Sequence, residues 1–180
     1  MRKEFYLAVS ERLLSIEGNP IQYVDLWNNN VEYIEQETNW PRPAVFVEFR
    51  PVVWERMTTR AAHEYQARAE VRLHIVTDWQ GSTSSENRDE YRLEAIEALD
   101  LSEQIHAALL GLTGEHFGNV EIQATLTNHN HEELVENVEV YNVTFVRSIE
   151  KQTKRIRVPM DASVKTSENQ EVRVVGPEIP

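Results

Sequence analysis

The stretch that most constrains the fold is residues 64–77, where apolar and polar residues alternate without interruption. The apolar positions are Tyr65, Ala67, Ala69, Val71, Leu73 and Ile75. The polar positions are Glu64, Gln66, Arg68, Glu70, Arg72 and His74. A period of two predicts a strand with one buried face and one solvent-facing face, and His74 on the solvent face is assigned no role.

This strand is long for a small domain. At about 3.3 Å per residue it would span on the order of 45 Å, two or three times a usual strand. Part of it should therefore project beyond the core. We expect a projecting hairpin, with residues 44–56 as the partner of the long strand.

The remaining elements follow from spacing and turn residues. Apolar residues at helical spacing over residues 2–16 predict an opening helix that ends at Gly18. Strands are predicted at 21–27, 44–49, 120–127 and 138–149, the last of them central in the sheet because it is apolar on much of both faces. A helix is predicted from about 88 to 112, with a kink or break near Asp100.

The order of these elements predicts an α+β fold. It comprises a mostly antiparallel sheet of four or five strands with two helices packed on one face. We place this domain at residues 1–149. Apolar content falls after Glu150, and residues 155–159 and 171–175 are short extended pieces between polar residues. Residues 150–180 are therefore predicted to form an extended C-terminal arm.

Composition excludes several kinds of chemistry. The chain has no cysteine, which removes disulfides, thiolate catalysis and most structural zinc sites. Its formal net charge is −12, which argues against nucleic acid as the primary ligand. No run of about 18 apolar residues and no signal sequence is visible, so we expect the protein in the cytoplasm.

One stretch invites a metal-site interpretation: His129, His131, Glu132 and Glu133 could supply ligands to a divalent ion. Their surroundings are typical of a solvated loop between two strands, and we favour that interpretation. The serines of residues 82–85 are not set in a GxSxG motif. We assign no catalytic, cofactor-binding or metal-binding residue, and we expect a binding protein without enzymatic activity.

Aromatic and basic residues are the candidates for contacts with other proteins. The four tryptophans lie at predicted strand ends, where packing at the edge of the core is favoured and a subunit contact is the alternative. The basic run in residues 151–157 is a solvated linker or a contact with an acidic partner. The candidate contact residues are Trp54, Tyr65, Trp79, Arg155 and Arg157.

Three segments together resemble the tail terminator, or tail completion, proteins of long-tailed bacteriophages. They are VRLHIVTDW at 71–79, LDLSEQIHAAL at 99–109 and VYNVTF at 140–145. The opening helix also fits, so the resemblance covers residues 1–149. It rests on element order and pattern, and the arm after residue 149 departs from it.

The resemblance implies a structural virion protein that forms a ring, usually a hexamer, at the head-proximal end of the tail tube. Such a ring ends tube growth and joins the tail to the connector of the head. Its partners would be copies of itself, the tail tube protein and the neck proteins, and DNA would pass through the lumen without specific binding. Another neck, connector or baseplate protein is the alternative, and a small metal-dependent hydrolase is a further one.

Overall fold

The computed structural model describes residues 1–31, 40–57, 63–78, 89–128, 134–149, 161–165 and 171–175. Side-chain burial is described for these residues except 63, 89–98, 161–165 and 171–175. The chain divides into two compact units, Met1–Ile149 and Glu150–Pro180. We describe each unit by itself.

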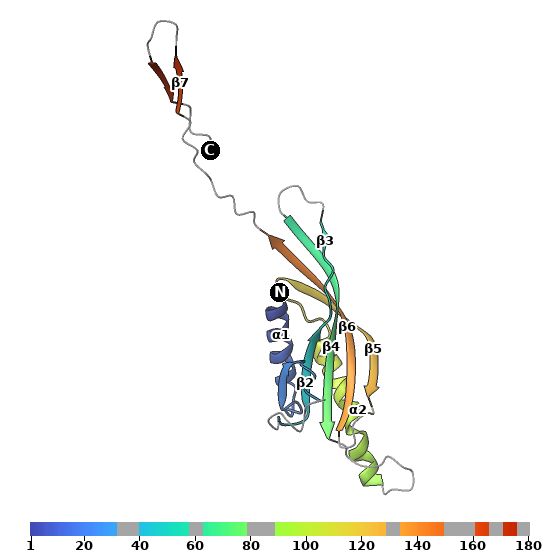
Figure 1. The fold of residues 1–180 in the computed structure, drawn as a ribbon. Coiled ribbons are helices and arrows are strands. Elements are labelled where there is room, and N and C mark those ends of the chain that lie inside the picture. The colour runs from blue at the N-terminus through green and yellow to red at the C-terminus, as the bar shows by residue number, and fades with distance from the viewer. Residues whose placement is uncertain are drawn as a thin grey trace. The chain divides into compact units, whose positions relative to one another are not determined.

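In its described residues, the first unit contains two helices and six strands (Figure 1). They are α1 (Arg2–Leu14), β1 (Tyr23–Leu26), β2 (Ala44–Phe49), β3 (Glu55–Arg56), β4 (His63–Asp78), α2 (Asp89–Leu109), β5 (Phe117–Asn128) and β6 (Leu134–Ile149). All six strands form one sheet in the order β1-β2-β4-β6-β5, and β3 also pairs with β4. β1 is parallel to β2, and every other pair is antiparallel.

This architecture confirms the predicted α+β class. The sheet has six strands rather than four or five because β2 and β3 are separate, with Pro51 in the segment between them. Proline has no amide hydrogen to donate to a neighbouring strand, so it interrupts pairing. β6 is an interior strand between β4 and β5, although β4 holds the middle of the order.

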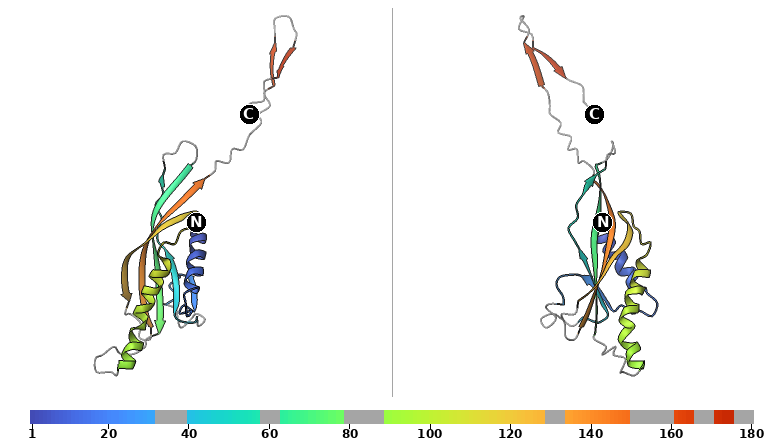
Figure 2. Two further views of the ribbon diagram at one scale, coloured as in Figure 1. Left: turned by 180° about the vertical axis from the view of Figure 1, so that it is seen from behind. Right: turned by 90° about the vertical axis from the view of Figure 1, so that its right-hand side faces the viewer.

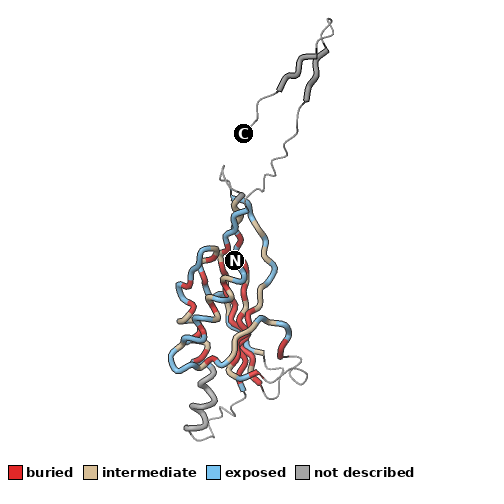
Figure 3. Tube along the Cα trace, turned by 90° about the vertical axis from the view of Figure 1, so that its left-hand side faces the viewer, coloured by how far each residue is buried: buried red, intermediate tan, exposed pale blue. Residues whose placement is uncertain are grey.

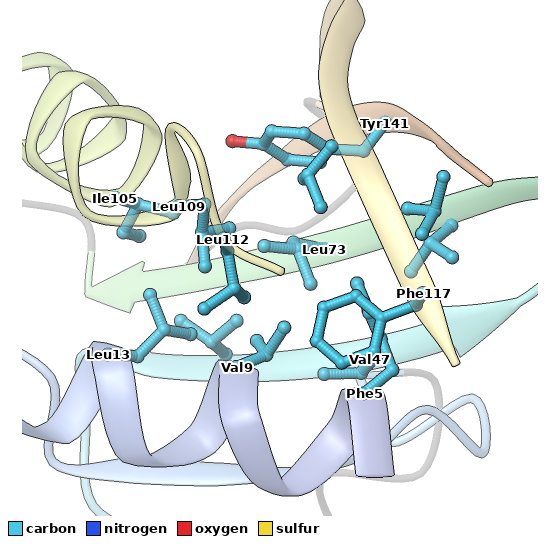
Figure 4. Close-up of a cluster of buried hydrophobic side chains, with 14 of the residues drawn as sticks. Phe5, Val9, Leu13, Val47, Leu73, Ile105, Leu109, Leu112, Phe117 and Tyr141 are labelled. Carbon is cyan, nitrogen blue, oxygen red and sulfur yellow. The ribbon is translucent and has the colours of Figure 1, made fainter. Parts of the chain in front are cut away.

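Both helices pack on one face of the sheet, as Figure 2 shows in its right-hand view. α1 contributes Phe5, Val9 and Leu13 to the main core, which follows their spacing on one side of the helix. The ring of Phe5 lies edge-on to Phe49, Phe117 and Phe145, with centroids 5.9, 5.1 and 5.7 Å away. Figure 4 shows how side chains from both helices meet those of the strands.

α2 runs as a single helix through Asp100, so the predicted break is absent. Leu101, Ile105 and Leu109 are spaced four residues apart and form its buried stripe. Leu99, next to Asp100, is exposed. No helix in the described part of the chain is long and apolar enough to cross a membrane.

A second, smaller core covers the opposite face of the sheet at one end of β4. It consists of Val31, Trp40, Ala44, Phe46, Val76 and Leu134, with Tyr23 and Trp27 packed against it. The prediction that His74 faces solvent is therefore wrong. The alternation correctly placed His74 opposite the helices, but the sequence pattern did not show that other residues cover that face.

The described residues of the second unit form an antiparallel hairpin of β7 (Asp161–Lys165) and β8 (Glu171–Val175). β8 coincides with one of the two predicted extended pieces, whereas its pairing with β7 was not predicted. The other predicted piece, residues 155–159, lies outside the described residues.

Candidate assembly surface

One end of the sheet extends beyond the core. The last pair between β2 and β4 is Phe49 with Val71, and the last pair between β5 and β6 is Phe117 with Phe145. β4 and β6 continue past these pairs and stay in register to His63 and Ile149, with β3 alongside β4 (Figure 1). We name residues 55–57, 63–66 and 146–149 the distal ribbon. The predicted projection of the long strand is thus present.

No described side chain of the distal ribbon is buried (Figure 3). Tyr65 of β4 is paired on one side with Arg56 of β3 and on the other side with Arg147 of β6. Met57, Val146 and Ile149 are apolar and exposed on the same ribbon. Tyrosine, arginine and methionine are enriched at protein interfaces, so the ribbon has the composition of a contact surface.

The predicted contact residues fall into two groups. Tyr65 is a half-buried member of the distal ribbon, and Trp54 is half-buried just before it, packed against the main core. This packing fits the core-edge interpretation of Trp54. Trp79, Arg155 and Arg157 lie outside the described residues.

The two outer strands of the sheet differ in how their edges are protected. β1 has four residues, and the carbonyl of Val24 accepts a hydrogen bond from the Tyr6 hydroxyl at 3.3 Å. The amide of Leu26 donates to the carboxylate of Asp25. Short strands and occupied backbone groups discourage pairing with another chain.

β5 has twelve residues and pairs on one side, with β6, among the described strands. Its register shifts between Gly118 and Glu121 and again between Ile122 and Ala124. Residues 124–128 are then in unbroken register with β6. Leu126, in the middle of this segment, is 52% exposed. The segment, called the β5 edge below, was not identified from the sequence.

The face opposite the helices carries a buried polar cluster centred on His74. Its Nδ1 lies 2.7 Å from a carboxylate oxygen of Glu136, and its Nε2 lies 3.3 Å from one of Glu48. His74 and Glu136 are only 7% and 4% exposed. The imidazole also stacks on the indole of Trp27, with ring centroids 3.7 Å apart and planes 4° apart.

The cluster joins three strands, because Glu48 is on β2, His74 on β4 and Glu136 on β6. Each ring nitrogen of His74 faces one of the two carboxylates, so the imidazole links Glu48 to Glu136. Arg50 donates to Glu48 at 2.9 Å from the solvent side. Burial alone would raise the pKa of Glu48, but hydrogen bonds from Arg50 and His74 outweigh it and hold that pKa below its usual 4.5. We interpret the cluster as structural.

A second polar contact ties α1 to the start of β5. The Nδ1 of His116 lies 2.9 Å from a carboxylate oxygen of Glu4. Gly114 lies close to both Glu4 and Phe117, where a side chain would collide with them. Burial would raise the pKa of Glu4, but hydrogen bonds from His116 and Glu115 lower it overall. This contact fixes where β5 begins.

Among the residues whose burial is described, Tyr141 is the largest fully buried side chain, and it belongs to the main core. Burial, and then the nearby charge of Glu139, raise its pKa. Its hydroxyl has no hydrogen-bond partner in the described part of the chain, and the ring of His106 stacks near it with centroids 6.2 Å apart. A phenol whose pKa is raised in this way is a weaker acid than free tyrosine and stays protonated at neutral pH, so we assign Tyr141 no chemical role.

The residues considered for a metal site, His129, His131, Glu132 and Glu133, lie outside the described residues, as do the serines of residues 82–85. Within the described ranges, no group of three or more His, Asp or Glu side chains is arranged to hold a metal ion. The described features that remain as functional candidates are the distal ribbon and the β5 edge.

No protein-family model matches the chain, and no curated protein matches it. Among solved structures, a chain from the virion of a native gene transfer agent particle is similar to this protein, with a TM-score of 0.48. The two chains are 11% identical, and the similarity covers 81% of this chain and 97% of the other.

Proposed function

We propose that this protein is a structural virion protein of a phage-like particle. Specifically, it would be a tail terminator or tail completion subunit that forms a ring of six copies at the head-proximal end of the tail tube. There it would end tube growth and join the tail to the connector and neck proteins of the head. The protein acts by contact with its neighbours and has no enzymatic activity.

The observation that carries this proposal is the distal ribbon, a paired extension of the sheet in which none of the described side chains is buried. Its three apolar side chains, Met57, Val146 and Ile149, remain exposed. Exposed strands with apolar residues are a liability unless another chain covers them. The kind of assembly comes from the sequence resemblance to tail terminator proteins. The three segments that carry this resemblance lie on β4, α2 and β6.

Charge supports the expected behaviour toward DNA. Residues 1–149 contain 12 Lys and Arg against 25 Asp and Glu, a formal charge of −13 per subunit. If part of that charge lines the lumen of a ring, it repels passing DNA instead of binding it. DNA would then move through the lumen without specific contacts.

Electron microscopy of the purified protein, alone and mixed with tail tubes from the same particle, tests the proposal. We expect closed rings, or rings that cap one end of the tube, and light scattering should show the matching increase in mass. A protein that stays monomeric in both conditions and never binds tubes contradicts the proposal.

The same images separate the alternatives. Localisation at the baseplate or inside the head connector would support another neck, connector or baseplate protein. Stoichiometric metal in the purified protein, lost in the double variant His129→Ala/His131→Ala, would instead support a metal-dependent hydrolase. Without such a site, that double variant should change the free energy of unfolding by no more than about 0.5 kcal/mol.

A further inference from the structure

The β5 edge has the features of a strand that accepts another strand. Residues 124–128 read Ala-Thr-Leu-Thr-Asn, so none of them is charged. Proteins commonly protect a sheet edge with lysine, proline or a bulge, and here both register shifts lie before this segment. The exposed Leu126 is at its centre. β1, the other outer strand, offers no comparable length.

The β7–β8 hairpin, for its part, is too small to be stable alone and would be stabilised by pairing with another sheet. Two strands alone are marginally stable in water, and units below about 40 residues rarely build a sufficient core. The register places Ala162 opposite Val174 and Val164 opposite Val172. The intervening positions carry Ser163 opposite Arg173 and Lys165 opposite Glu171. Apolar and polar pairs thus alternate over these four positions, whereas the fifth pair, Asp161 with Val175, is mixed. Alternation of this kind is the pattern of a sheet with one face against another protein.

Charge favours a partner that resembles the first unit of this protein. Residues 150–180 contain six Lys and Arg against five Asp and Glu, a formal charge of +1. Four of these basic residues lie within 151–157, which holds no acidic residue. The first unit, at −13, would attract such a segment from a neighbouring copy.

We propose that the β7–β8 hairpin of one copy adds to the sheet of a second copy at the β5 edge. Backbone hydrogen bonds along residues 124–128 supply the affinity, and the apolar positions of the hairpin cover Leu126. Each copy then gives one hairpin and receives another, a head-to-tail contact that closes into a ring. This inference rests on the proposed ring assembly and names the surfaces that would build it.

Cysteine cross-linking tests the contact directly, because the chain contains no cysteine of its own. One full-length chain carries Leu126→Cys and a tag, and an untagged chain carries Val174→Cys. The two are mixed under assembling conditions and mildly oxidised. A covalent heterodimer is expected, since a disulfide requires two Cα atoms within roughly 7 Å. The matched control replaces Leu126→Cys with Leu110→Cys, at a residue that is 71% exposed just after α2, and should give none.

A second pair of variants measures the energetic role of the edge. Leu126→Lys puts a charge on the β5 edge and should weaken association about tenfold or more, whereas Leu110→Lys should not. Circular dichroism checks that both variants fold. Assembly by Leu126→Lys equal to that of the unmodified protein overturns the inference.

The outcomes separate this inference from the proposed function. Rings that form without the heterodimer overturn the hairpin contact and leave the ring intact. Rings in which Leu126→Cys chains cross-link to each other show that two β5 edges pair, which also overturns it. The absence of any oligomer, with or without tail tubes, contradicts the proposed function itself.

Discussion

Apolar and polar residues alternate along most of β4, yet the two ends of this strand differ in burial. Near Asp78, residues on both faces are buried: Leu73 and Ile75 under the helices, His74 and Val76 under the second core. Near His63, no described side chain is buried. Alternation specifies which residues share a face, but the burial of that face depends on which segments pack on it.

The comparison shows where this strand contributes to folding and where it is available for contacts. The buried end contributes to the stability of the unit. We expect substitutions at the exposed end to change folding little, since no described side chain there is buried. Four substitution experiments test this division, from the largest expected effect on stability to the smallest.

The first compares neighbouring residues on β6, the strand paired with β4. Phe145→Ala removes a fully buried ring that contacts Phe5, and should cost about 3 to 5 kcal/mol of unfolding free energy. Val146→Ala, one residue further on the distal ribbon, should cost no more than about 0.5 kcal/mol. Urea unfolding monitored by circular dichroism measures both. Equal losses would mean that the ribbon is part of the core.

The second tests the polar cluster at the buried end. His74→Ala leaves the buried carboxylate of Glu136 without its imidazole partner and removes the ring stacked on Trp27. The loss should be about 3 kcal/mol and no larger, because Glu136 keeps the hydrogen bond that the Asn128 side chain donates to it, at 2.7 Å. Gln66→Ala, exposed on the same face of the same strand, is the control. A small loss in His74→Ala would show that the cluster is stabilised by other groups.

The third uses pH to isolate Glu48. Its pKa is lower in the folded protein than the usual 4.5, so the folded state binds this proton less readily than the unfolded state. The resulting stabilisation is present above about pH 4.5 and is lost as the pH falls through the lowered pKa. Glu48→Gln should therefore lose less unfolding free energy between about pH 7 and pH 4 than the unmodified protein, by up to about 1 kcal/mol. An identical pH dependence in both proteins would show that Glu48 contributes nothing.

The fourth tests the exposed end. The double variant Tyr65→Ala/Arg147→Ala should unfold within about 1 kcal/mol of the unmodified protein, since both side chains lie outside the core. Ring formation or tube binding, followed by light scattering, should weaken markedly. Unchanged assembly would remove the distal ribbon from the contact surface, and loss of folding would place it in the core.

Much of the fold could be predicted because several elements follow strict periods. The spacing of Phe5, Val9 and Leu13 on α1 and the alternation along β4 were enough to identify both elements and their inward faces. The length of β4 predicted the distal ribbon. These are local signals, because the backbone geometry of a helix or a strand determines which residues lie on the same face.

The candidate surface could be predicted only in part, because it depends on which strands become neighbours. His74 and Glu136 are joined by the register of β4 and β6, which no local pattern specifies. The same is true of Leu126, whose exposure follows from the outer position of β5. Tyr65 was identified because it lies on the one strand whose length alone indicated a projection.

The pairing of β4 with β6 has a consequence for how the chain folds. All sixteen residues of β4 pair with β6, yet α2 and β5 intervene in the sequence. Such non-local pairing slows folding, because a large loop must close before any of these backbone bonds can form. During synthesis, β4 leaves the ribosome well before β6. Until β6 has been made, the edge of β4 that pairs with β6 has no partner from this strand. Productive folding of this protein should therefore depend on keeping nascent chains apart, through low concentration or chaperones, until β6 has been made.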